Sequence, residues 1–97
     1  MNLSVNIDAV RQLGKIIGDH AAEYNSEIAK IYSINDEVKQ VWRGTASESY
    51  TSKVDSYRTN MESLGKAIEE YSQYLLGTAA PSYENMRDSV SAAAGRL

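Results

Sequence analysis

The stretch that decides the fold is Val41–Glu48, which reads VWRGTASE and lies near the middle of the 97 residues. It contains the only tryptophan, Trp42, followed two positions later by Gly44. Glycine can adopt the left-handed backbone at which helices end, and a threonine three positions before a glutamate, as in TASE, is typical of a capping box. We therefore predict a turn at residues 42–45 between two long helices.

Apolar residues precede this turn at a spacing of seven, a pattern that only a helix places on one side. Asn6 is the predicted N-cap, and we expect the helix at about residues 7–42. The rows beside the apolar row are mixed, so the stripe is wider than a coiled-coil seam. Gly14 and Gly18 weaken a helix, so either they mark the close approach of another helix or they are merely tolerated. The row consists of Val10, Ile17, Tyr24, Ile31 and Val38.

After the turn, eight apolar residues alternate at spacings of four and three. They predict a second helix at about residues 46–76. Gly77 and Pro81 interrupt the row, and the next apolar residues are out of step by about one position. We therefore expect residues 77–97 to form a separate tail that is mobile or partly helical. The row consists of Tyr50, Val54, Tyr57, Met61, Leu64, Ile68, Tyr71 and Leu75.

Two helices alone form a poor core, because each hides only the strip that faces the other. Each further side chain buried stabilises by about 1.5 to 3 kcal/mol, so association is favoured. The expected fold is one all-α domain over residues 1–97, a helix-turn-helix hairpin of two long antiparallel helices that dimerises into a four-helix bundle. Tyr32 and Tyr74 lie outside the main rows, and we expect them to be surface contacts for any further partner.

The composition excludes several classes of protein. Hydrophobic residues make up 42% and prolines number one, which favours a folded helical domain over a disordered chain. The net charge of −3 and the scattered basic residues argue against nucleic acid binding and against a membrane-lytic helix. The sequence has no cysteine, no segment long enough to span a membrane and no Sec-type signal peptide at its start.

No group of residues has the pattern of an active site. His20 is the only histidine, and although Glu23 and Glu27 lie along its side of the helix, a lone histidine there is more often ordinary than a metal ligand. Adjacent acidic residues such as Glu69 and Glu70 point in different directions on a helix, so they lack the convergent geometry that acid–base catalysis needs. We expect a non-enzymatic protein without a metal or other cofactor.

Trp42, Arg43 and Gly44 form a W-x-G triplet in the middle of about a hundred residues, between two amphipathic helices. The chain thereby resembles the WXG-100 (ESAT-6-like) family of type VII secretion substrates. The resemblance implies an antiparallel pairing of hairpins, as a homodimer or with a related small helical protein. It also implies export without Sec cleavage through a membrane-bound secretion ATPase, with Trp42 and Gly44 in a recognition surface completed by the C-terminal segment of the partner.

The family also carries a C-terminal tyrosine followed four residues later by an acidic residue. Here Tyr83 is followed at four by Arg87 and at five by Asp88. On a helix, a step of five lies about 100° away from a step of four. Either Tyr83 and Asp88 form a degenerate export signal, or the signal comes from a heterodimer partner or a co-secreted toxin.

The resemblance therefore implies a protein made in the bacterial cytoplasm and secreted, a non-enzymatic substrate or adaptor that acts by dimerisation and docking. The alternative is an intracellular helical chaperone or adaptor that pairs with a larger secreted toxin.

Overall fold

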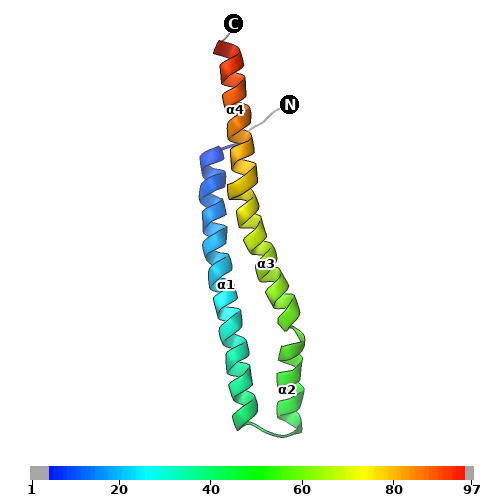
Figure 1. The fold of residues 1–97 in the computed structure, drawn as a ribbon. Helices are drawn as coiled ribbons and strands as arrows, with labels where there is room; N and C mark the ends of the chain where they lie inside the picture. Colours follow the sequence, from blue (N-terminus) through cyan, green and yellow to red (C-terminus); the bar gives the residue numbers. More distant parts are fainter. Residues whose placement is uncertain (1–4, 96–97) are drawn as a thin grey trace. The chain divides into compact units, whose positions relative to one another are not determined.

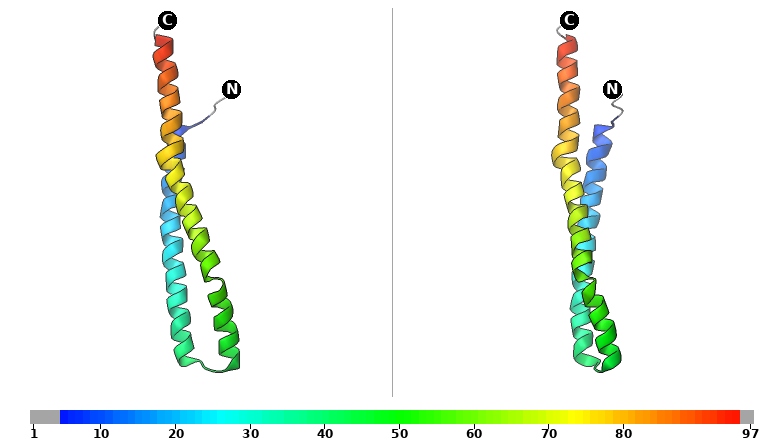
Figure 2. Two further views of the ribbon diagram at one scale, coloured as in Figure 1. Left: turned by 45° about the vertical axis from the view of Figure 1, so that its right-hand side comes forward. Right: turned by 90° about the vertical axis from the view of Figure 1, so that its right-hand side faces the viewer.

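The computed structural model describes residues 5–95, and within this range every secondary-structure element is helical. The elements are α1 (Ile7–Val41), α2 (Thr45–Ser56), α3 (Arg58–Tyr74), the π-helical turn η1 (Leu75–Ala79) and α4 (Ala80–Gly95) (Figure 1). The chain reverses direction between α1 and α2, so that α2 runs antiparallel beside the end of α1 (Figure 2). The prediction of an all-α helical hairpin is confirmed.

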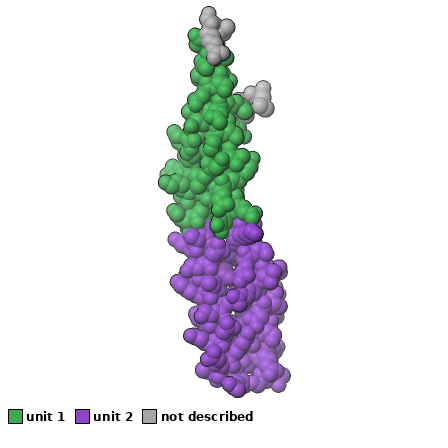
Figure 3. Space-filling view, in the orientation of Figure 1, with its two compact units in different colours: residues 1–19, 68–97 green, residues 20–67 purple. Residues whose placement is uncertain are grey.

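The chain divides into two compact units (Figure 3). Unit 1 comprises Met1–Asp19 and Ile68–Leu97, and unit 2 comprises His20–Ala67. Both α1 and α3 contribute residues to each unit. In each unit a segment of α1 packs against a segment from the second half of the chain.

The helix α1 begins where the sequence predicted. The side-chain oxygen of Asn6 accepts a hydrogen bond of 3.0 Å from the backbone N–H of Ala9, and its carbonyl accepts one from Val10. Asp8 lies in the first turn, where a negative charge favours the helix dipole. The prediction of Asn6 as N-cap is confirmed.

Apart from Tyr32, the residues of α1 that are buried against the second half of the chain belong to a row beside the predicted one. The predicted row is half-buried, except for Ile31, which is exposed. Small or compact residues allow two helix backbones to approach closely, so the larger apolar side chains lie beside the contact instead of within it. The buried row consists of Ile7, Gly14, Ala21, Ile28 and Asn35.

Glycines mark this close approach in both units. In unit 1, a Cβ atom at Gly14 would lie 3.1 Å from the side chain of Leu76, and one at Gly18 would lie 2.7 Å from the hydroxyl of Ser72. In unit 2, a Cβ atom at Gly65 would overlap the side chain of Asn25. Of the two interpretations open at Gly14 and Gly18, close approach is the one that the structure supports.

The second half of the chain stays helical beyond residue 76, where the sequence predicted a tail that is mobile or partly helical. In η1 the N–H of Ala80 bonds to the carbonyl of Leu75, five residues earlier. This wider turn absorbs one extra residue, which explains the shift of one position in the apolar row. It also relieves the clash that the ring of Pro81 would make with the carbonyl of Gly77 in a regular α-helix. Helix α4 reaches Gly95, and the last two residues of the predicted tail lie outside the described range.

The predicted second helix is interrupted at Tyr57, between α2 and α3 (Figure 1). The N–H of Tyr57 donates to the carbonyl of Val54, three residues earlier, which is a tighter turn than that of an α-helix. The hydroxyl of Tyr32 donates to the same carbonyl at 2.8 Å. Tyr32 is only 1% exposed, so the prediction that it is a surface contact is wrong: it is the largest fully buried side chain among the described residues.

Candidate functional site

The W-x-G turn is built by backbone geometry that glycine alone adopts easily. Helix α1 ends with the N–H of Trp42 bonded to the carbonyl of Val38 at 2.8 Å. Gly44 then has φ 124° and ψ 179°, a region that is essentially restricted to glycine. Gly44 is the N-cap of α2, and no side chain caps this end, so the predicted capping box does not form. Helix α2 nevertheless begins at Thr45, with the N–H of Glu48 bonded to the carbonyl of Gly44 at 3.0 Å.

The ring of Trp42 is held in place but left partly open. It is 44% exposed and stacks on the ring of Tyr50, with centroids 6.4 Å apart and planes inclined by 25°. The carbonyl of Trp42 accepts a hydrogen bond from the hydroxyl of the buried Ser47. The sequence pointed to Trp42 but gave no sign of these two supports, because both depend on how the turn folds back.

A polar groove of about 390 Å³ adjoins the turn. Along its wall, the ammonium of Lys39 lies 2.5 Å from the carboxylate of Asp55, which also accepts a hydrogen bond from Asn35 at 3.0 Å. The bond from Lys39, supported by its charge and by Asn35, lowers the pKa of Asp55 below its usual value. The same bond raises the pKa of Lys39. The groove is lined by Lys39, Trp42, Arg43, Gly44, Ser47, Glu48, Thr51, Ser52 and Asp55.

The second predicted apolar row separates into two rows of different exposure. In unit 2, Val54 and Met61 are half-buried, whereas Tyr50, Tyr57 and Leu64 are 66%, 50% and 54% exposed. In unit 1, Ile68 and Leu75 are half-buried and Tyr71 is exposed. The hairpin therefore covers the inner row, which consists of Val54, Met61, Ile68 and Leu75. The outer row, which consists of Tyr50, Tyr57, Leu64 and Tyr71, stays at least half exposed, even where Tyr50 stacks on Trp42.

Helix α1 adds exposed aliphatic residues to the outer row in unit 2. The hydroxyl of Tyr24 donates to the carbonyl of Met61 at 3.0 Å, so these residues meet at one edge of the helix pair. Ile31 follows Tyr24 by seven positions and Leu64 follows Met61 by three, which places both on that same side. We call the exposed apolar residues of this side the outer face of unit 2. It comprises Ile31, Ile34, Tyr50, Tyr57 and Leu64.

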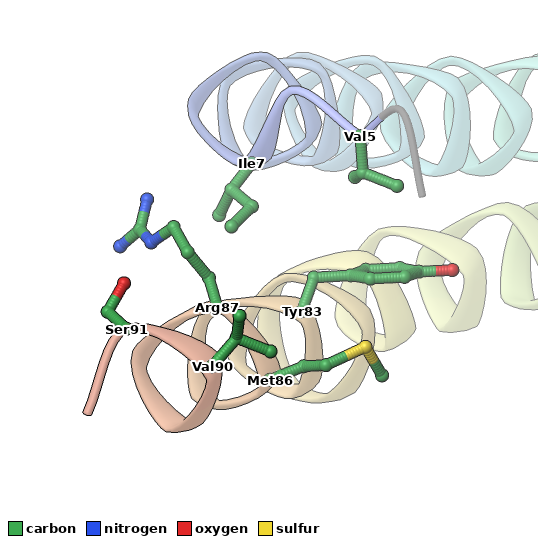
Figure 4. A pocket seen from close by; sticks show the side chains of 7 residues that line it. All are labelled: Val5, Ile7, Tyr83, Met86, Arg87, Val90 and Ser91. Atoms are coloured by element: carbon green, nitrogen blue, oxygen red, sulfur yellow. The ribbon is translucent and has the colours of Figure 1, made fainter. Parts of the chain in front are cut away.

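The predicted C-terminal pair, Tyr83 and Asp88, is not brought together. Tyr83 is half-buried and lines a groove of about 340 Å³ in unit 1, into which Arg87 also extends (Figure 4). Asp88 does not line this groove, and its carboxylate lies 3.5 Å from the guanidinium of Arg87. The groove is lined by Val5, Ile7, Tyr83, Met86, Arg87, Val90 and Ser91.

The remaining predicted packing residues lie at the edges of the helix pairs. In unit 1, Val10 and Ile17 are half-buried, and the guanidinium of Arg11 pairs with the carboxylate of Glu84 at 2.6 Å, which ties α4 to α1. This pairing lowers the pKa of Glu84 and raises that of Arg11. In unit 2, Tyr24 and Val38 are half-buried.

No arrangement of catalytic groups is found among residues 5–95. The imidazole of His20 lies 3.5 Å from the carboxylate of Glu23, and both side chains are exposed. The described residues contain no cluster of three side chains that could hold a metal ion. None of the described helices is long and apolar enough to cross a membrane.

Comparison with known proteins gives a family and one distant relative. The model of the WXG100 family, described as proteins of 100 residues with WXG, matches residues 2–88. The chain is also similar to the ESAT-6-like protein EsxB of Corynebacterium diphtheriae, with 29% identity over 79 residues. That alignment covers 81% of this chain and 74% of the relative. No solved structure matches the chain.

Proposed function

Because the chain belongs to the WXG100 family, whose members are small proteins secreted by type VII systems, we propose that it is a type VII secretion substrate or adaptor. Members of this family are not known as enzymes. In this proposal the protein acts by pairing with another helical hairpin and by docking to the export machinery, without catalysis and without a cofactor.

The observation that carries the proposal is the outer face of unit 2. Three large side chains in one row, Tyr50, Tyr57 and Leu64, are each at least half exposed. Burying side chains of this size stabilises by about 1.5 to 3 kcal/mol each. A face of this kind on a small hairpin favours a partner that covers it.

The exposed area of the whole chain supports pairing as well. The chain exposes 7393 Å² of surface, whereas a compact monomer of 10.7 kDa exposes about 5,500 Å². The difference of about 1,900 Å² per chain exceeds the roughly 800 Å² that each partner buries in a standard interface and lies in the range of the larger, obligate interfaces. A second copy or a related small helical protein, packed as a four-helix bundle, would cover it, and the predicted packing residues would form the shared core.

For export, we assign Trp42 and Gly44 to the surface that the secretion ATPase recognises. The support for this is the ring of Trp42, which stacks on Tyr50 yet stays nearly half open to solvent, while Ser47 holds the backbone carbonyl of Trp42. Tyr83 and Asp88 are the second part of the proposed signal, although Arg87 and not Asp88 shares the groove of Tyr83. Export in this scheme does not use the Sec pathway.

Two measurements test the proposal. Deleting the secretion ATPase in the native host should remove the protein from the culture supernatant while it accumulates in the cells, and unchanged export would contradict the assignment. Sedimentation of the purified protein, alone and mixed with any small helical protein encoded beside it, tests the pairing. A folded monomer at micromolar concentration in both samples would contradict it.

A second function is favoured by the C-terminal groove, where an arginine stands four residues after Tyr83 in place of an acidic residue. If the chain lacks a complete signal of its own, it could serve as an intracellular chaperone that pairs with a larger secreted toxin. Affinity capture from the native host separates the two functions. A large stoichiometric partner, with no free secreted dimer, would support the chaperone.

A further inference from the structure

The break between α2 and α3 is held by a side chain from α1. The hydroxyl of Tyr32 donates to the carbonyl of Val54 at 2.8 Å, and the same carbonyl accepts the N–H of Tyr57 at 3.1 Å. In a regular α-helix that carbonyl would accept the N–H of Arg58, four residues later. Insertion of a side chain into the backbone ladder is a known cause of helix breaks.

Two residues of α3, after the break, also contact Tyr32. The guanidinium of Arg58 lies 5.0 Å from the ring centroid and is itself held by Glu62 at 2.9 Å. The sulfur of Met61 lies 3.7 Å from the hydroxyl. Because Tyr32 is almost fully buried, its hydroxyl has no access to water, and the carbonyl of Val54 is its strongest acceptor.

The tight turn at Tyr57 corrects the direction of the outer row. Seven residues of an α-helix rotate by about 700°, which is about 20° short of two full turns, so a row spaced by seven drifts around the helix. A turn with about three residues rotates by about 120° per residue instead of about 100°. One such step therefore offsets the drift of one of the two heptads between Tyr50 and Leu64, and so reduces the drift between them from about 40° to about 20°.

We propose that Tyr32 is a positioning residue for the outer face of unit 2. Its hydroxyl holds the tight turn at Tyr57, and the turn brings Tyr50, Tyr57 and Leu64 closer to one straight row for a helical partner. The inference rests on the proposed function in so far as the outer face pairs with another hairpin. Beyond that function, the inference is that the buried hydroxyl of Tyr32, which does not contact the partner hairpin, determines how well the partner fits the outer face.

The test compares Tyr32→Phe with Tyr24→Phe. Both variants lose one hydroxyl bond to a carbonyl of the second half of the chain and keep the ring, but only Tyr32 bonds at the break. In Tyr32→Phe the N–H of Arg58 can take the freed carbonyl of Val54, so its hydrogen exchange should slow by about tenfold. The dissociation constant of the paired state, measured by sedimentation, should rise by about tenfold in Tyr32→Phe and by less than about twofold in Tyr24→Phe.

Two results would overturn the inference. One is an unchanged exchange rate at Arg58 in Tyr32→Phe, because the turn would then persist without the hydroxyl. The other is an equal rise in the dissociation constant for both variants, because the effect would then follow general loss of stability. A wild-type chain that stays monomeric with every candidate partner contradicts the proposed pairing, whereas the exchange rate at Arg58 tests the role of Tyr32 in the turn even in that monomer.

Discussion

The hydroxyl of Ser72 donates a hydrogen bond of 2.6 Å to the backbone carbonyl of Gly14, 58 residues earlier in the chain, and both residues are buried in unit 1. Serine has a short side chain, so this bond forms only because the two helices lie very close together. The absence of a side chain at Gly18 is part of the same contact, since a Cβ atom there would lie 2.7 Å from the Ser72 hydroxyl.

We expect Gly18→Ala to have opposite effects in two backgrounds. In the wild type, the new methyl group displaces the Ser72 hydroxyl from its buried bond, a loss of about 1 to 3 kcal/mol that outweighs the gain of about 1 kcal/mol in helix propensity. In a Ser72→Ala background the clash is gone, and the same substitution should raise the melting temperature. Thermal unfolding of the four proteins in this cycle measures the coupling. Additive effects would mean that Gly18 and Ser72 are not in contact.

Gly44→Ala should destabilise the chain through its backbone alone. Its φ of 124° is strained for alanine, while no atom lies within 4 Å of the place where the methyl group would stand. The expected loss is about 1 to 3 kcal/mol, which is about 4 to 8 °C in melting temperature for each kcal/mol.

Gly77→Ala is the matched control for this substitution. Gly77 is equally open, with no atom within 4 Å of a Cβ, but its φ is not positive. Alanine there should leave the melting temperature unchanged or raise it. A similar loss at both positions would show that the conformation of Gly44 is not the cause.

Periodicity predicted the helices and the turn, because the spacing of apolar residues and the position of Gly44 are local properties of the chain. It did not predict which row lies inside the hairpin. The large apolar residues give the strongest periodic signal, yet Gly14, Gly65 and Ser72 take the inner positions, since only small residues permit the close approach.

The two irregular turns show a second limit of prediction from sequence. The shift of one position after Leu76 was visible as an interrupted row, but a separate tail and a π-helical turn produce the same pattern. The break at Tyr57 had no local signal, because its cause is the hydroxyl of Tyr32, 22 residues from Val54. In the candidate site, Trp42 was predictable from the triplet, whereas its support by Tyr50 and Ser47 depends on tertiary contacts.

The π-helical turn leads to a prediction about chain length. Removing Thr78 in a Pro81→Ala background should turn η1 into regular α-helix and leave Ala80 and Glu84 on the side that faces α1. The melting temperature should equal or exceed that of Pro81→Ala alone. Inserting one alanine after Thr78 in the same background rotates α4 by about 100° away from α1 and should lower the melting temperature. Equal melting of the deletion and the insertion would contradict this account of the register.

Acid should weaken each unit through one ion pair. Lys39 lowers the pKa of Asp55 in unit 2, and Arg11 lowers the pKa of Glu84 in unit 1. A carboxyl group whose pKa is lower in the folded than in the unfolded chain stabilises the fold at neutral pH. This contribution disappears as the pH falls through the lowered pKa.

The measurement is the melting temperature from about pH 7 to about pH 3, for the wild type, Asp55→Asn and Glu84→Gln. Each amide keeps the shape of the carboxylate but cannot ionise. Each variant should melt below the wild type at neutral pH, and the difference should shrink toward acid pH. A difference that stays constant over the whole range would show that the charge of the carboxylate is not what stabilises the pair.

Trp42→Ala distinguishes a structural from a docking role for the ring. Full burial of a tryptophan would make the loss about 3 to 5 kcal/mol, but a ring that is 44% exposed and stacked on one tyrosine should account for only about 1 to 2 kcal/mol. If the exposed part of the ring docks to the export machinery, secretion should fall far more than this small loss of stability explains.

Ser47→Ala is the matched control, because it removes the hydroxyl bond to the Trp42 carbonyl and leaves the ring in place. That loss is also about 1 kcal/mol. Amounts in the supernatant and in the cell, measured beside melting temperatures, separate the two roles. If both variants lower the melting temperature equally and only Trp42→Ala loses export, the ring is identified as a docking group. Parallel loss of export in both variants would mean that export depends on the stability of the turn. The exposed ring would then have no separate docking role.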